Sequence, residues 1–169
     1  MAAESQTEAR RHKRVTRVKS SPIDLLVWEY TTSLDQEGTF QKLKEASKRF
    51  SVDELNASGL NALQQCALDG NLQGVKLLVA LGADCDKKGR GGWTALHYAA
   101  SEGYIAIVRY LLSHGANVRI KNNEQKFPVE ITEDKGILKL LYRATVASTP
   151  LDILHNANSR TSEQHKESI

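Results

Sequence analysis

The 169-residue chain is 40% hydrophobic and 25% charged, a composition that suits one compact domain with tails. No run approaches about 18 consecutive apolar residues, so we expect no membrane-spanning helix, and the polar N-terminus has no apolar stretch typical of a secretory signal. The two cysteines form no CxxC pair, which predicts an intracellular, reducing location in the cytoplasm, the nucleus or both.

The positive charge of the chain is concentrated at its N-terminus. Residues 1–21 hold six basic and two acidic side chains, a net charge of +4. The rest of the chain holds 17 basic and 18 acidic side chains, a net charge of −1. A nearly neutral body argues against direct nucleic-acid binding by the folded domain. The tail contains a short basic cluster of Arg10, Arg11, Lys13 and Arg14. The cluster fits nuclear import or contact with an acidic partner, and equally a tail that only keeps the protein soluble.

The polar segment 1–20 is predicted to be a disordered tail. Residues 21–55 follow it, and we expect an N-terminal helical cap there, with helices within 23–30 and 40–50. Pro22 suits the first turn of the first helix, because that position needs no backbone N–H.

Two segments align without a gap at an offset of 33 residues, 56–86 and 89–119. The matched pairs include Leu63 with Leu96, Ala67 with Ala100, Gly70 with Gly103, Val75 with Val108, Leu78 with Leu111, and Gly82-Ala83 with Gly115-Ala116. A fixed period of this length is the signature of a repeat protein, in which each unit buries its apolar face against its neighbours. We therefore expect repeats at 56–88 and 89–121.

Each unit reads as two short helices followed by an exposed turn. In the second unit Thr94 opens a helix of mostly small residues, and Gly103 ends it because glycine tolerates the left-handed conformation of a helix C-terminus. The second helix carries an apolar stripe and ends at Gly115. The stripe consists of Ile107, Val108, Leu111 and Leu112.

A third, degenerate unit is expected at 122–146, since about three units are needed for a stable stack. Pro128 lies 33 residues after Ala95, and an apolar helix containing Ile137, Leu138, Leu140 and Leu141 follows it. This unit is predicted to close the C-terminal end of the stack. The polar segment 147–169 is predicted to be a disordered tail.

The period, together with TALHYAA, IVRYLL and HGAN in the second unit, resembles the ankyrin repeat. The resemblance implies an all-α solenoid of helix-turn-helix units with β-turn tips, a non-enzymatic role in protein binding, and a monomer. It also implies that His97 holds the turn of its repeat through backbone hydrogen bonds. In the first unit Gln64 takes this position, so the resemblance leaves open how that turn is held.

Solenoids of this type bind partners with their concave face. On this chain we expect the turn tips and first helices to provide that surface, and Trp and Tyr are frequent among residues that dominate binding energy. The predicted partner-binding residues are Arg90, Trp93, Tyr98, Glu102, Tyr104, Lys121 and Asn123.

No residue pattern points to catalysis, a metal or a cofactor. His97 and His114 have no Cys, His or carboxylate at a familiar metal-ligand spacing. Cys66 falls among small packed residues, where a buried, unreactive thiol is expected. The glycine-rich stretch at 89–92 lacks the spacing of a phosphate-binding loop and is predicted to be a turn tip.

Within the ankyrin family, residues 56–145 resemble the repeats of myosin-phosphatase targeting subunits and related small regulators of type-1 protein phosphatase. The residues that carry this resemblance are SGLNALQQCALDGNL and GGWTALHYAASEGYIAIVRYLLSHGAN. The resemblance implies the phosphatase catalytic subunit as a partner. That family docks through a [RK]-V-x-[FW] segment, whereas Arg14-Val15-Thr16-Arg17 and Arg17-Val18-Lys19-Ser20 both lack the aromatic residue.

The pairing of DGNLQGVKLLV with GWTALH also resembles the small Notch-regulated ankyrin-repeat proteins. That resemblance implies an alternative function as a nuclear ankyrin cofactor of a transcription complex, with another ankyrin protein as the partner.

Overall fold

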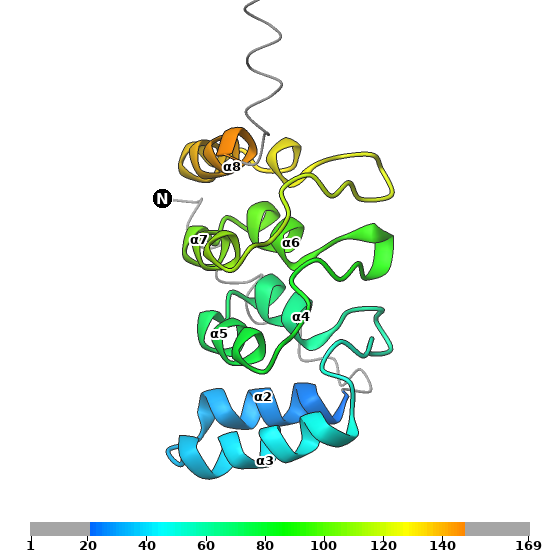
Figure 1. The fold of residues 1–169 in the computed structure, drawn as a ribbon, viewed down its shortest axis with the longest axis vertical. Helices are drawn as coiled ribbons and strands as arrows, with labels where there is room; N and C mark the ends of the chain where they lie inside the picture. Colours follow the sequence, from blue (N-terminus) through cyan, green and yellow to red (C-terminus); the bar gives the residue numbers. More distant parts are fainter. Residues whose placement is uncertain (1–20, 148–169) are drawn as a thin grey trace, which may run out of the picture.

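The computed structural model describes residues 21–147 (Figure 1). The predicted tail 1–20 lies outside the described residues, as does the predicted tail 147–169 except for Ala147, which is the last residue of a helix. The described part consists of helices and turns, and contains no strand. The helices are α2 (Pro22–Thr32), α3 (Gln36–Arg49), α4 (Ala62–Asp69), α5 (Leu72–Ala80), α6 (Ala95–Ser101), α7 (Ile105–Ser113) and α8 (Lys135–Ala147), with two short 3-10 turns, η1 (Arg90–Gly92) and η2 (Pro128–Glu130).

The helices stack as pairs in chain order, which confirms the predicted all-α solenoid (Figure 1). The pair α4–α5 forms one layer, α6–α7 the next, and η2–α8 the last. The first helices contact one another along one side, from α4 to α6 to η2, and the second helices do so along the other side, from α5 to α7 to α8. The loops between layers project in one direction (Figure 1).

The core of the stack consists of the apolar positions that the repeat pattern predicts. The residue pairs 33 apart are buried in both repeats: Leu63 and Leu96, Ala67 and Ala100, Val75 and Val108, Leu78 and Leu111. Burying a leucine or valine side chain stabilises the fold by roughly 1.5–3 kcal/mol. The small alanines let α4 and α6 approach closely, because they place no long side chain between the helices.

The turn between the two helices of a repeat depends on a glycine. Gly70 and Gly103 follow α4 and α6 and have φ angles of 75° and 81°. A side chain at this conformation clashes with the following carbonyl, so glycine is favoured there. Both helices were predicted from the sequence to end at these glycines, and α4 and α6 end within two residues of them.

The N-terminal cap is formed by α2 and α3, of which α2 contacts the stack. Ser21 and Asp24 form a capping box, with Asp24 N donating to Ser21 Oγ at 3.1 Å and Ser21 N donating to Asp24 Oδ2 at 3.0 Å. Ile23 and Val27 are buried, and α2 packs against α4 and α5 while α3 packs against α2. The second helix begins at Gln36, four residues before its predicted start, because Asp35 caps it by accepting from Gly38 N at 2.9 Å.

In the last layer the 3-10 turn η2 takes the place of a first helix. Pro128 is its first residue and is buried, and α8 buries Ile137 and Leu141 against the rest of the stack. Within residues 21–147, none of the helices is long and apolar enough to cross a membrane.

Candidate protein-binding surface

Three loops of the same length project from the stack, and we call them finger 1 (51–61), finger 2 (84–94) and finger 3 (117–127). A backbone hydrogen bond closes each tip, from Asn56 N to Leu60 O at 2.8 Å, from Gly89 N to Trp93 O at 2.8 Å, and from Asn122 N to Lys126 O at 3.0 Å. The fingers therefore share one local geometry, spaced by the repeat period.

In each finger, the residue directly before the one whose carbonyl closes the tip has a left-handed backbone. It is Gly59 in finger 1, Gly92 in finger 2 and Gln125 in finger 3, with φ angles of 76°, 73° and 62°. Gln125 is the one non-glycine residue with positive φ in the described part of the chain, and its side chain is exposed.

A side chain at the base of each finger accepts a hydrogen bond from the backbone. Asn61 N donates to Gln64 Oε1 at 3.0 Å, Thr94 N to His97 Nδ1 at 3.2 Å, and Phe127 N to Glu130 Oε2 at 2.7 Å. Gln64, His97 and Glu130 thus perform the same task at equivalent positions.

Gln64 also answers how the first turn is held without the histidine. Its Nε2 donates to Trp93 O at 3.2 Å, and His97 Nε2 contacts Lys126 O at 3.3 Å, an equivalent bond one repeat later. Gln64 Nε2 makes a second bond to Lys87 O at 2.8 Å. Both side chains therefore join a repeat to the next finger.

His97 is neutral at ordinary pH because it is fully buried. Burial lowers the pKa of its imidazole, since a charged ring is costly to desolvate. Nδ1 accepts from both the N–H and the hydroxyl of Thr94, so the proton resides on Nε2, which donates to Lys126 O. The histidine is a structural residue that ties finger 3 to α6.

Three of the predicted binding residues lie together where finger 2 meets α6. The rings of Trp93 and Tyr98 are tilted against each other with their centroids 5.0 Å apart, and both are half-buried. Burial raises the pKa of the Tyr98 hydroxyl, and the nearby Arg90 guanidinium opposes this shift. Arg90 is exposed at the finger tip. An aromatic pair beside an exposed cation can bind both apolar and anionic groups.

Lys121 and Asn123 lie on the adjacent finger 3. Asn123 N donates to Gly91 O at 2.8 Å, which joins finger 3 to finger 2. The ammonium of Lys121 lies 4.9 Å from the centre of the Phe127 ring. Both predicted residues are exposed, so fingers 2 and 3 present one continuous surface.

Glu102 and Tyr104 lie at the other end of α6, away from the fingers. Glu102 is the exposed C-cap of α6. The ring of Tyr104 packs onto Gly70 of the preceding repeat, where a Cβ atom would lie 2.6 Å from it. The structure thus separates these two residues from the cluster around Trp93. The predicted basic residues Arg10, Arg11, Lys13 and Arg14 lie outside the described residues.

Lys88 lies within a predicted turn tip but was not among the predicted binding residues. It is exposed, and its Nζ donates to Lys121 O at 2.9 Å, joining fingers 2 and 3. The signal was available, because Lys87, Lys88 and Arg90 stand close together within one finger. This basic signal was obscured because Asp84 and Asp86 precede the basic residues in the sequence. Only the structure shows that these carboxylates accept from backbone N–H groups.

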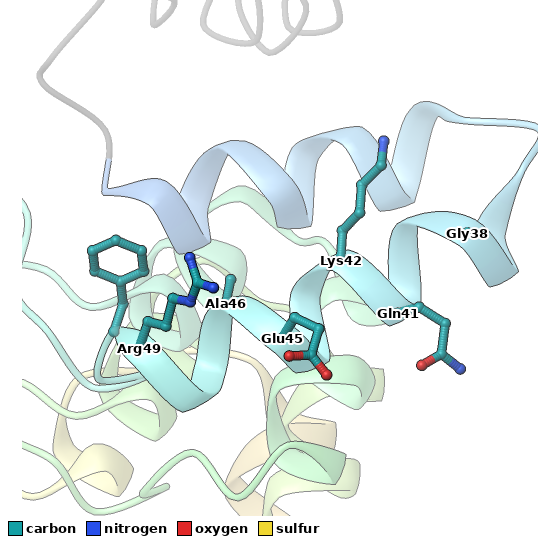
Figure 2. A pocket seen from close by; sticks show the side chains of 7 residues that line it. Gly38, Gln41, Lys42, Glu45, Ala46 and Arg49 are labelled. Atoms are coloured by element: carbon teal, nitrogen blue, oxygen red, sulfur yellow. The ribbon is translucent and has the colours of Figure 1, made fainter.

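A shallow groove of about 550 Å³ lies along the outer side of α3. Figure 2 shows that its walls come from α3 and the residue that follows it, with Lys42 directed toward α2. Lys42 Nζ pairs with Glu29 Oε1 at 3.0 Å. A groove made by one helix face has no opposing wall, so it cannot enclose a small substrate.

The described residues hold neither an activated thiol nor a cluster of metal-binding side chains. Burial raises the pKa of the Cys66 thiol to about 12 and raises that of Cys85 as well, so neither is an activated nucleophile. Among residues 21–147, no three His, Cys, Asp or Glu side chains gather as a metal site.

Comparison with known proteins identifies the family. A family model described as ankyrin repeats in three copies matches residues 33–122. Protein phosphatase 1 regulatory subunit 27 of Mus musculus is 37% identical over 131 residues, which cover 76% of this chain and 82% of that protein. Its Homo sapiens relative is 36% identical over 144 residues, covering 83% and 91%.

Two further matches agree. Notch-regulated ankyrin repeat-containing protein B of Danio rerio is 48% identical over 64 residues, covering 38% of this chain and 58% of that protein. The crystal structure of the ankyrin repeat domain of Bcl-3 superposes with a TM-score of 0.60 at 25% identity, over 69% of this chain and 50% of that one. Fold, period and relatives together show that the chain belongs to the ankyrin-repeat family of protein-interaction adaptors.

Proposed function

We propose that this protein is a non-enzymatic regulatory subunit of type-1 protein phosphatase, which it binds through its ankyrin surface. The observation that carries the proposal is the length of the match to the two phosphatase 1 regulatory subunits. It extends over 131 and 144 residues, whereas the ankyrin family model accounts for residues 33–122. The match thus spans most of this chain and also 82% and 91% of those proteins, as expected of proteins that share their whole domain organisation.

The surface in finger 2 and finger 3 supports this proposal. It places Trp93, Tyr98 and Arg90 together, and Trp, Tyr and Arg are the residue types that most often dominate the energy of a protein interface. The surface belongs to a stack whose neighbouring fingers are joined by hydrogen bonds. A preorganised surface binds with a smaller loss of conformational entropy.

The test measures binding of the purified phosphatase catalytic subunit to the immobilised full chain and to a form that lacks residues 1–20. Binding that survives the deletion indicates that the repeats dock the phosphatase. Binding that is lost indicates that the basic tail does so, despite its lack of the docking aromatic. No binding to the full chain would contradict the proposal.

A second candidate is a nuclear cofactor that binds another ankyrin protein. The observation that favours it is the 48% identity over 64 residues to Notch-regulated ankyrin repeat-containing proteins, a higher local identity than that of the phosphatase subunits. The helix α2 covers the N-terminal end of the stack by packing on α4 and α5. A partner that extends the stack would therefore approach at α8. Nuclear accumulation and capture of an ankyrin protein without phosphatase would favour this function.

A further inference from the structure

The charges of the folded part are separated along the stack. Residues 21–86 carry five Lys or Arg and ten Asp or Glu side chains, a net charge of −5, and residues 87–147 carry ten and five, a net charge of +5. Because the repeats stack in chain order, this division in the sequence is also a division in space (Figure 1). The change of sign falls within finger 2.

Fingers 2 and 3 carry six exposed cations. Lys126 pairs with Glu124, and the Arg119 guanidinium donates to Thr145 O. The other four cations are Lys87, Lys88, Arg90 and Lys121. Lys88 Nζ reaches the carbonyl oxygen of Lys121 at 2.9 Å, so its charge lies between the two fingers. The ion pairs of residues 21–147 are Lys42–Glu29, Lys48–Glu45 and Lys126–Glu124. None of the four finger cations takes part in an ion pair there.

Three of the five acidic side chains of the fingers, those of Asp53, Asp84 and Asp86, accept hydrogen bonds from backbone N–H groups. Asp53 Oδ1 accepts from Asp84 N at 3.1 Å, and Asp86 Oδ1 accepts from Asn117 N at 2.8 Å, which joins successive fingers. Asp84 Oδ1 accepts from Asp86 N at 2.9 Å. These carboxylates therefore hold the fingers in position, and none of them forms an ion pair with the four cations.

Next to these cations lies the aromatic pair of Trp93 and Tyr98. A surface with cations on two adjacent loops and an aromatic pair beside them fits an extended chain with carboxylate and apolar side chains. We infer that fingers 2 and 3 bind an acidic, extended segment of a partner protein. The inference rests on the proposed function as a protein-binding subunit and specifies the chemistry of the segment that this surface binds.

Nucleic acid is a poorer match to the same surface. The folded part has no net charge, with 15 basic and 15 acidic side chains in residues 21–147. Binding along a nucleic-acid backbone requires a long positive track, whereas this patch spans two fingers and ends at a half of the stack that carries −5. A short acidic segment can bind the patch without reaching the negative half.

The experiment uses a fluorescein-labelled peptide of alternating Glu and Gly, with a peptide of alternating Gln and Gly as the uncharged control, and measures anisotropy with the full chain. The finger variant is Lys88→Glu, Arg90→Glu and Lys121→Glu. The matched control variant is Lys76→Glu, Arg109→Glu and Lys139→Glu, three exposed cations on α5, α7 and α8. Both variants change the net charge equally, and their circular dichroism and thermal midpoints verify folding.

We expect the unaltered chain to bind the Glu peptide more tightly than the Gln peptide, with an affinity that falls when salt is raised from about 0.05 M to about 0.5 M. The finger variant should bind the Glu peptide at least about tenfold more weakly, because each reversal removes an attraction and adds a repulsion. The control variant should lose much less.

Equal losses in the two variants would show that only net charge matters and would overturn the inference. Tighter binding of a labelled single-stranded or duplex RNA than of the Glu peptide, lost in the finger variant, would also overturn it. Absence of phosphatase binding to the unaltered chain would refute the proposed function. The inference about the acidic segment would still be decided by the peptide measurement alone. Tight phosphatase binding with no preference for the Glu peptide would refute this inference and leave the proposed function intact.

Discussion

Gln64, His97 and Glu130 show how different side chains can fill one structural position. Each accepts a hydrogen bond from the first backbone N–H at the base of its finger, and Gln64 and His97 also reach the carbonyl of the next finger. The side chain at this position must supply a hydrogen-bond acceptor. In two of the three repeats it must also supply a donor that reaches the next finger. A neutral amide and a neutral imidazole both meet this requirement.

His97 makes the fold sensitive to acid. Because burial lowers the pKa of its imidazole in the folded chain, the unfolded chain binds the proton more readily below pH 6.5. The contribution of His97 to the free energy of unfolding is therefore complete above about pH 6.5. It decreases as the pH drops from there to the folded-state pKa, by at most about 1.4 kcal/mol per pH unit. Urea denaturation between pH 7.5 and 5 measures this loss.

The variant His97→Gln provides the control, since Gln64 already occupies this position in the preceding repeat with the same bonds. We expect it to fold and to lose less stability than the unaltered chain over the same pH range. Identical pH profiles for the two proteins would show that other groups cause the acid sensitivity.

Gln125 is strained because its φ angle of 62° is left-handed. The equivalent residues of the other fingers are Gly59 and Gly92, and a non-glycine residue costs about 1–2 kcal/mol in this conformation. The substitution Gln125→Gly should therefore raise the free energy of unfolding, by up to about 1 kcal/mol once the greater entropy of glycine in the unfolded chain is included.

The same exchange at Gln41, in the middle of α3, should have the opposite sign, because glycine inside a helix costs about 1 kcal/mol relative to a good helix former. Chemical denaturation of both variants tests the pair. A destabilised Gln125→Gly would show that the glutamine side chain contributes more than its backbone costs.

Among the elements, the α2–α3 cap is the one that the repeat period does not reveal. It contributes through α2, which buries Ile23 and Val27 while leaving Leu25 exposed at 59%. Ile23→Ala should lower the free energy of unfolding by about 2–5 kcal/mol, because it removes buried methyl groups and leaves a cavity. Leu25→Ala on the same helix should change it by no more than about 0.5 kcal/mol.

Denaturation followed by circular dichroism distinguishes these results, provided that both variants unfold in one cooperative step. Equal, small effects of the two variants would show that α2 unfolds separately from the stack. The cap would then be an attached segment and not part of the core.

The elements of the repeats follow from the sequence because their cause is local and periodic. The spacing of Leu96, Val108 and Leu111 and the helix-ending glycines predicts the helices, and the structure confirms them. The predicted start of α3 was four residues too late, because the helix is capped by the single side chain of Asp35, which is not part of the apolar pattern. The direction of the finger carboxylates was also out of reach, because it is fixed by backbone groups about 31 residues away.

For the molecule as a whole, stacking converts a repeat in the sequence into a surface. Trp93 and Tyr98 come from a finger and a first helix, and Lys88 bridges to the next repeat. The cluster of Arg90, Trp93 and Tyr98 was predicted as separate residues from their types, and the structure adds that they are adjacent. Glu102 and Tyr104 were predicted on the same grounds but lie at the far end of α6. Residue type alone does not distinguish the two ends of a helix.

The double variant Trp93→Ala and Tyr98→Ala tests whether this surface binds the phosphatase catalytic subunit. Interface aromatics of this kind contribute about 2 kcal/mol or more each when truncated. One such loss lowers the affinity about thirtyfold, and we expect the two together to lower it by up to about a thousandfold. The matched control replaces two exposed aromatics elsewhere on the stack, Trp28 and Tyr142, which are 67% and 60% exposed. Because Trp93 also packs on His97 with ring centroids 5.8 Å apart, thermal midpoints must accompany the affinities. A folded double variant that binds as tightly as the control would place the phosphatase on another face. Any partner that contacts fingers 2 and 3 should bind more weakly once both rings are removed.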